Sequence, residues 1–266
     1  MTVETGGRQE APPILELRKV SKHFGAVQVL YDVDFHVASG EVMALVGDNG
    51  AGKSTLIKCI AGIHPIDGGE MVFEGNKVSI HGPKDAADLG IEVVYQDLAL
   101  ADNLDVVQNM YLGREETSSL LRLDETAMEK RASETLKGLS VTTISSVRQT
   151  VAGLSGGQRQ SVAVAKAVMW NSRVVILDEP TAALGVAQTR QVLDLVKRLG
   201  EQGLAVILIS HNLHDVFEVA DSITVLRLGQ NVAEFKRAET NQQKVVEAIT
   251  AGTLSDVPGQ SSEVTA

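Results

Sequence analysis

The sequence predicts an α/β fold in which a mixed, largely parallel sheet is covered by helices, with an antiparallel β subdomain and a helical lobe. Three apolar runs, residues 42–46, 174–177 and 204–209, have the continuity of strands buried on both faces. The first two are followed by segments with helical spacing, and strands that alternate with helices build parallel sheets. At 266 residues, the chain is long enough for one or two domains with a sizeable core.

The N-terminal part of the chain predicts the antiparallel subdomain. Apolar and polar residues alternate over 14–17 and 29–37, as in half-buried strands. A turn at 65–69 precedes a short strand at 71–73, and Gly90 is expected to end a short helix over 84–89. These strands would lie around the ligand of the parallel sheet.

The stretch from Asp97 to Gly153 predicts a mostly helical lobe. Residues 105–112 carry apolar side chains at helical spacing, and Asp124 is the expected N-cap of a helix through Lys137. A loop is expected at 115–119. The globular domain is predicted over 14–250, with disordered tails at 1–13 and 251–266, because those ends lack apolar periodicity.

A glycine-rich loop follows the first buried strand and leads into a helix. It fits the phosphate-loop pattern G-x-x-x-x-G-K-[ST] without a mismatch. Backbone amides and the helix start would hold phosphate oxygens, Lys53 would reach the β- and γ-phosphates, and Ser54 would bind Mg²⁺. The fold is therefore expected to be of the P-loop NTPase type, with a nucleotide held by Gly47, Asp48, Asn49, Gly50, Ala51, Gly52, Lys53, Ser54 and Thr55.

Two carboxylates, Asp178 and Glu179, end the second apolar strand. Ligands of doubly wound sheets bind at the carboxyl ends of the strands. Asp178 would hold the magnesium shell, and Glu179 would orient or deprotonate the attacking water. An isolated Asp-Glu pair is commonly a solvated strand end, but the upstream phosphate loop favours chemistry here.

The pentapeptide Leu154-Ser155-Gly156-Gly157-Gln158 lies between these two motifs and opens a helix. With the phosphate loop and the acidic strand end in this order, the chain resembles the nucleotide-binding subunit of an ATP-binding cassette (ABC) transporter over about residues 14–250. The resemblance implies that Ser155, Gly156, Gly157 and Gln158 bind the γ-phosphate of an ATP held by another cassette. Because the sequence has one phosphate loop and one pentapeptide, it implies a homodimer or a heterodimer with a related cassette.

The resemblance also assigns three weaker matches. Phe24 matches the aromatic residue that stacks on adenine, Gln96 matches the glutamine that contacts Mg²⁺ and the lytic water, and His211 matches the switch histidine at the γ-phosphate. Each residue alone would more commonly be a packing or surface residue. Their order relative to the strong motifs favours the functional assignments. His214 lacks that support and is expected on a helix surface.

Membrane partners are implied by the same resemblance. The helical lobe would dock on an integral membrane permease, and an extracytoplasmic sugar-binding protein would belong to the same system. The apolar residues Leu98, Ala99 and Leu100 follow Gln96 and are expected to be exposed. We expect them to mark the docking surface, with packing inside the lobe as the alternative. The protein is thus expected at the cytoplasmic face of the inner membrane as a peripheral subunit.

Residues 181–186 and 210–213 most resemble the ATPases of monosaccharide importers for fructose, ribose or xylose, and a single cassette resembles the unfused, fructose type. Gly185 stands where most cassettes have an aspartate, and Ser161 and Lys166 stand where arginines are frequent. We therefore expect an ATP hydrolase that powers monosaccharide uptake. Import of another small solute such as an amino acid, or a soluble cassette ATPase outside transport, remains the alternative.

Composition agrees with these expectations. The formal charge of −10 and the lack of a basic block make nucleic acid an unlikely ligand. No apolar run approaches the ~18 residues that span a bilayer, and the polar N-terminal residues do not form a signal peptide. A single cysteine, Cys59, excludes an internal disulfide and is expected in the core, and no His/Cys spacing indicates zinc.

Overall fold

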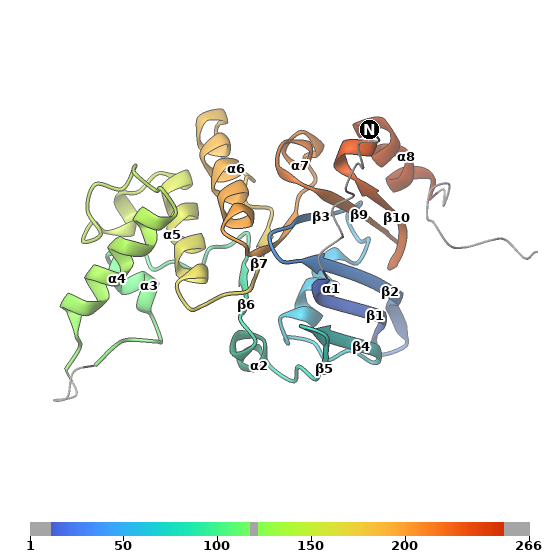
Figure 1. Ribbon diagram of the computed structural model, residues 1–266, viewed down its shortest axis with the longest axis horizontal. Coiled ribbons are helices and arrows are strands. Elements are labelled where there is room, and N and C mark those ends of the chain that lie inside the picture. The colour runs from blue at the N-terminus through green and yellow to red at the C-terminus, as the bar shows by residue number, and fades with distance from the viewer. Residues whose placement is uncertain (1–11, 118–121, 253–266) are drawn as a thin grey trace, which may run out of the picture.

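The computed structural model describes residues 12–117 and 122–252, which form two sheets and a helical lobe (Figure 1). Most of the two expected tails, and residues 118–119 of the expected loop, lie outside these described residues. The first strand begins at Pro13 and the last helix ends at Ala251, each one residue beyond the limits expected for the domain. Differences of this size are within the uncertainty of element ends.

The larger sheet runs through the centre of the molecule and has the strand order β10-β9-β3-β8-β7-β6. Neighbouring strands are parallel except β10, which is antiparallel to β9. The strands are β3 (Val42–Val46), β6 (Ile91–Val94), β7 (Val174–Asp178), β8 (Ala205–Ile209), β9 (Ser222–Arg227) and β10 (Gln230–Lys236). The expectation of a mixed, largely parallel core is confirmed.

Both faces of the central strands are buried, as their continuous apolar sequence predicts. Along β7, Val175 and Leu177 join one hydrophobic cluster, whereas Val174 and Ile176 join another. Successive side chains of a strand point to opposite faces. This strand is therefore packed on both faces up to the half-buried Asp178 at its end.

The smaller sheet is antiparallel, with the order β2-β1-β4-β5, and confirms the expected subdomain. Its strands are β1 (Pro13–Phe24), β2 (Val27–Ala38), β4 (Gly68–Phe73) and β5 (Asn76–Val78). Leu15, Leu17 and Leu30 pack with Leu56 and Ile60 of α1 (Lys53–Ile60) in a cluster that also includes the second face of the larger sheet. The phosphate-loop helix thus lies between the two sheets.

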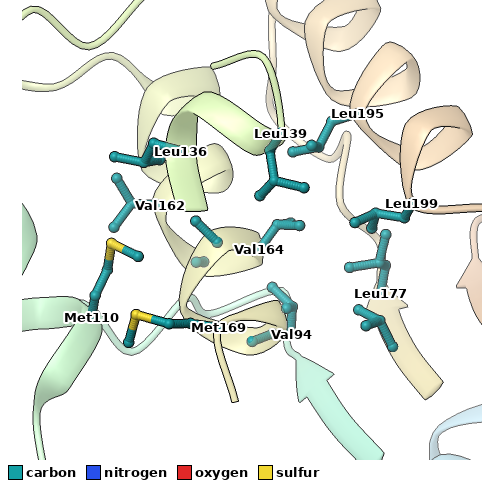
Figure 2. Packing of buried hydrophobic residues seen from close by; sticks show 14 of the residues in the cluster. Val94, Met110, Leu136, Leu139, Val162, Val164, Met169, Leu177, Leu195 and Leu199 are labelled. Atoms are coloured by element: carbon teal, nitrogen blue, oxygen red, sulfur yellow. The ribbon is translucent and has the colours of Figure 1, made fainter. Parts of the chain in front are cut away.

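The helical lobe lies at the opposite end of the molecule from the smaller sheet (Figure 1). Its helices α3 (Val106–Tyr111), α4 (Glu125–Gly138) and α5 (Gly156–Val168) pack with α6 (Val186–Glu201) over the larger sheet. Figure 2 shows Met110, Leu136, Val162, Leu195 and Leu177 meeting in this cluster. Asp124 caps α4, as expected, by accepting a hydrogen bond from the Ala127 amide.

The lobe is less helical than the sequence analysis expects. Residues 97–104 and 139–150 are irregular, and the backbone of the second segment pairs with the start of α3, where Val106 N donates to Gln149 O and Val107 N to Val147 O. The backbone carbonyl groups of residues 147 and 149 thus accept long-range hydrogen bonds in place of the bonds of a helix. Half-buried Val141, Ile144 and Val147 pack against the lobe core without helical periodicity.

The remaining helices position loops at the ends of the strands. Short α2 (Pro83–Asp88) ends before Gly90, which has φ +80, as predicted. Short 3₁₀ turns lie at Val151–Gly153 and Arg237–Glu239. Helices α7 (Leu213–Val219) and α8 (Gln242–Ala251) pack in a third cluster against β3, β9 and β10.

Candidate nucleotide-binding and catalytic site

The phosphate loop connects the carboxyl end of β3 to the start of α1. Gly47 and Gly52 have φ values of +150° and +104°, a region that favours glycine. A Cβ atom on Gly47 would collide with the carbonyl oxygen of Leu226, so the loop passes too close to β9 for any larger residue. The glycines of the motif are therefore required by the backbone as well as by the approach of a ligand.

Lys53 lies across this loop. Its Nζ atom donates hydrogen bonds to the carbonyl oxygens of Gly47 at 2.6 Å and Asp48 at 3.0 Å. Burial lowers the pKa of Lys53, while the nearby carboxylates of Glu179, Asp48 and Asp178 act in the opposite direction. The ammonium group is thus half-buried among groups that favour its charge, and it is placed to meet phosphate oxygens.

A cavity of about 640 Å³ opens beside the loop at the carboxyl ends of the strands. It brings together residues from four separate segments that the sequence analysis assigns to one site. These assigned residues are Gly47, Asp48, Asn49, Lys53, Ser54, Gln96, Asp178, Glu179 and His211. Gly50, Ala51, Gly52 and Thr55 line an adjoining hollow over the same loop.

Asp178 and Glu179 meet this cavity at the end of β7. Burial, and then the negative charge of Glu179, raise the pKa of Asp178, while Lys53 and Lys58 counteract them. Glu179 has φ +51 although it is not glycine, and a residue in that conformation is usually held there by its surroundings. Two neighbouring carboxylates therefore face a site with one lysine, an arrangement that favours binding of a further cation.

His211 and Glu179 are in direct contact. The His211 Nδ1 atom lies 2.8 Å from Glu179 Oε2, and the side chains are 73% and 16% exposed. The two residues follow the neighbouring parallel strands β8 and β7, paired at Asp178 and Ile209. A carboxylate and an exposed imidazole ring are thus side by side among the residues that line the cavity.

The residues that line the cavity include a set of donors that fits magnesium. Ser54, Gln96 and Asp178 all line the cavity and offer hydroxyl, amide and carboxylate oxygens. Within the described residues, no group of three or more His, Cys, Asp or Glu could hold a metal ion. Since Mg²⁺ is commonly held by one or two carboxylates plus substrate phosphates, this donor set suits Mg²⁺ bound together with a nucleotide.

Phe24 lies outside this phosphate cavity, at the end of β1. Its ring is 43% exposed and packs edge-on against His64 at a centroid distance of 5.0 Å. The Lys22 ammonium is 5.4 Å from the ring centroid and pairs with Asp67. The ring is therefore supported on the protein side and partly open to solvent, as a stacking platform requires.

The pentapeptide lines neither the cavity nor the adjoining hollow. Ser155 caps α5 in a reciprocal pair with Gln158: the Gln158 amide donates to Ser155 Oγ at 3.4 Å, and the Ser155 amide donates to Gln158 Oε1 at 2.8 Å. Ser155 and Gly156 are exposed and Gly157 is buried. The pentapeptide thus presents an exposed helix start away from its own chain's phosphate loop, on the lobe side of β7 (Figure 1).

Several lining residues escape the sequence analysis. Val246, Ile249 and Thr250 of α8 form one wall of the cavity, and burial together with Asp178 raises the pKa of neighbouring Tyr95. No motif identifies these residues, because only the packing of α8 beside α7 brings them to the site. For Tyr95, the sequence offers one signal, which is its place next to Gln96.

Three single-residue expectations have clear outcomes. Leu98 and Leu100 are half-buried because the irregular segment folds back onto the lobe core, so the expectation of an exposed apolar run is wrong for both. Ala99, between them, is exposed as expected. Cys59 is buried, which raises the pKa of its thiol to about 11. His214 is exposed on α7, as expected.

Of the helices formed by residues 12–117 and 122–252, none combines the length and hydropathy needed to cross a bilayer.

Four features together define an ATP-binding cassette ATPase. They are a phosphate loop after β3, paired carboxylates at the end of β7, which β8 separates from β3 in the sheet, a helical lobe and an antiparallel subdomain. The chain belongs to the ABC transporter family, whose profile matches residues 30–182. The resemblance on which the sequence analysis rests, and the fold class that it predicts, are thereby confirmed.

Similar proteins agree with this assignment. The xylose/arabinose import ATP-binding protein XylG of Sulfolobus acidocaldarius is 46% identical, over 92% of this chain and 96% of that protein. The fructose import ATP-binding protein FrcA of Rhizobium meliloti is 47% identical, over 83% of this chain and 87% of that protein. A solved dimeric ATP-binding cassette bound to ADP and Pi is 26% identical with a TM-score of 0.69, over 84% of this chain and 98% of its own.

Proposed function

We propose that this protein is the ATP-hydrolysing subunit of an importer for a monosaccharide, with a fructose-like sugar as the first candidate. The observation that carries the proposal is the likeness to XylG and FrcA, at 46% and 47% identity over most of each chain. Both names specify import of a simple sugar. The cargo differs between these two relatives, so the class of sugar is better supported than the particular one.

In the proposed reaction, Lys53 and the loop amides hold the phosphates of ATP. Ser54, Gln96 and Asp178 would hold Mg²⁺, which would neutralise charge on the phosphates. Glu179 orients the attacking water and accepts its proton, and His211 contacts the γ-phosphate. The cavity that these side chains share supports the assignment, because residues from all four segments line it.

Two chains would act together, head to tail. The exposed start of α5 offers backbone amides and Ser155 to an anion, yet it lies outside its own chain's cavity. A partner's ATP is the occupant that suits it, and the similar dimeric cassette supports a two-chain assembly. A homodimer, or a pair with a related cassette, would contain two such shared sites.

The sugar would cross the membrane through a separate integral membrane permease. An extracytoplasmic sugar-binding protein would deliver the sugar to this permease. ATP binding would close the cassettes, and hydrolysis with product release would open them again, so that the attached permease alternates its access. The chain would then be peripheral, on the cytoplasmic side of the membrane. The helical lobe is the expected docking region, with Leu112 and Leu123 as exposed apolar residues on it, 46% and 54% exposed.

The test begins with the membrane proteins that co-purify with a tagged form of this chain from its native cells. Reconstituted in vesicles with ATP, they are assayed for uptake of labelled fructose, ribose, xylose and arabinose, with a labelled amino acid as comparison. Uptake of one of these sugars with the wild-type chain, and none with Glu179→Gln, is the expected result. Uptake of the amino acid alone, or failure to find any membrane partner, would contradict the sugar-importer proposal.

A further inference from the structure

Two segments leave the larger sheet side by side and carry the residues proposed for hydrolysis. One continues from β7 through Glu179, and the other continues from β8 through His211 into α7. The Glu179 amide donates to the carbonyl oxygen of Ile209 at 3.0 Å, so the segments are joined at their starts. The 2.8 Å contact between Glu179 and His211 joins them again at the cavity mouth.

A second side-chain link joins the same segments behind the cavity. The Thr181 hydroxyl donates a hydrogen bond to Asp215 Oδ2 at 2.7 Å. Asp215 belongs to the first turn of α7 and is only 3% exposed. A carboxylate buried to this extent needs a donor, and the Thr181 hydroxyl supplies one.

The backbone on both sides of Thr181 is in an unusual conformation. Glu179 and Ala183 have φ values of +51° and +60°, in a region that costs energy for residues other than glycine. Local hydrogen bonds help to hold this shape, from the Ala182 amide to Glu179 O at 3.1 Å and from the Leu184 amide to Thr181 O at 3.2 Å. Thr181 lies between the two strained residues and is the point at which the loop is anchored to a helix.

We propose that Thr181 and Asp215 are positioning residues for ATP hydrolysis, which hold the Glu179 segment against α7. This inference rests on the roles of Glu179 and His211 in the proposed function. The outer contact between those two residues opens when Glu179 turns to water and His211 to phosphate. The buried bond between Thr181 and Asp215 stays closed, so the Glu179 carboxylate keeps its distance from the γ-phosphate during turnover.

The test uses the full chain and compares three variants. Thr181→Val removes the hydroxyl at nearly constant shape, Thr181→Ser keeps it, and Thr224→Val makes the same change at a buried threonine on β9. We expect Thr181→Val to lower kcat at saturating Mg-ATP at least about tenfold, because small misplacements of reacting groups are costly. Equilibrium ATP affinity should stay near the wild-type value, whereas Tm should fall because buried Asp215 loses its donor. Thr181→Ser and Thr224→Val should keep kcat within about twofold.

A double-mutant cycle separates positioning from a general structural role. If the bond acts through the Glu179–His211 geometry, Thr181→Val should cost much less in a His211→Ala background than in the wild type. Should Thr181→Val not fold, Thr181→Val with Asp215→Leu removes both polar partners and carries the test. Wild-type kcat in a folded variant without the hydroxyl, or an equal loss in both backgrounds, would overturn the inference.

Glu179→Gln, measured in parallel, distinguishes the two proposals. If that variant hydrolyses ATP normally, the assignment of Glu179 fails, and the positioning inference fails with it. If it is inactive while Thr181→Val is normal, only the positioning inference is wrong.

Discussion

The imidazole Nδ1 of His211 lies 2.8 Å from the Glu179 carboxylate, although 32 residues separate them along the chain. The contact exists because β7 and β8 are parallel neighbours and each ends next to one of the pair. It joins Glu179, the proposed general base, to His211, the residue proposed to contact the γ-phosphate. The first prediction therefore concerns Glu179.

Glu179→Gln should retain ATP binding and lose turnover. The amide keeps the size of the side chain but cannot accept a proton, and a general base typically contributes about 100- to 10,000-fold to a rate. ATP affinity is measured by equilibrium binding, and turnover by phosphate release. With ATP and Mg²⁺, size-exclusion chromatography should show a shift from monomer to dimer, because the closed state persists; near-normal hydrolysis would remove Glu179 from its role.

Sharing of the site between two chains is tested with a pair of variants that disable different halves. Lys53→Ala should weaken ATP binding, whereas Ser155→Arg should bind ATP but hydrolyse poorly, because the new side chain fills the space for the partner's γ-phosphate. An equal mixture should recover about a quarter of the wild-type rate, since half of randomly formed dimers are mixed and each contains one intact site.

Thr142→Arg is the matched control for Ser155→Arg, because it places an arginine at another exposed position of the lobe. It should leave hydrolysis unchanged. If Ser155→Arg and Lys53→Ala each kept full activity alone, the head-to-tail arrangement would be wrong.

Docking on a permease is tested at Leu112 and Leu123, which are exposed on the lobe. Replacing both with Ser should leave ATP affinity and Tm within error, because exposed substitutions typically change stability by less than about 0.5 kcal/mol. Membrane association and sugar uptake should fall. Val27→Ser, at a 64% exposed position on the antiparallel sheet, is the control that should change neither. Retention of both activities in the double variant would exclude this part of the lobe as the docking surface.

Asp178 makes the stability of the chain depend on pH in a definite direction. Burial and Glu179 raise the pKa of this carboxyl from 3.8, so the folded chain binds its proton more tightly than the unfolded chain. The resulting penalty is absent at pH values below 3.8, grows as pH rises through the raised folded pKa, and is constant above it.

Asp178→Asn should therefore stabilise the nucleotide-free chain at neutral pH while it abolishes Mg²⁺-dependent hydrolysis. Since the side chain is only half-buried, solvent screening keeps the expected gain in Tm small. Thermal unfolding at pH 7 and near pH 4 measures it, and the gain should shrink at the lower pH. Asp88→Asn, on an exposed part of α2, should change Tm little; a lower Tm for Asp178→Asn at pH 7 would contradict the prediction.

Local chemistry explains how much the sequence determines about this protein. The phosphate loop is a contiguous motif whose glycines adopt positive φ, and the apolar runs of β3, β7 and β8 predict strands buried on both faces, as the structure has them. The caps at Asp124 and Ser155 are equally local, since each side chain bonds an amide three residues ahead. Fold class, the phosphate cradle and the order of the motifs therefore follow from neighbouring residues alone.

Contacts between distant segments were decided only by the tertiary structure. The same apolar spacing suits a docking surface or a packed one, and the return of residues 97–104 onto the lobe core leaves Leu98 and Leu100 half-buried against it. Likewise, α8 reaches the cavity and Asp215 reaches Thr181 because helices pack on a completed sheet. Side-chain patterns specify which face of an element is buried, whereas the neighbour that buries it depends on how all the elements assemble.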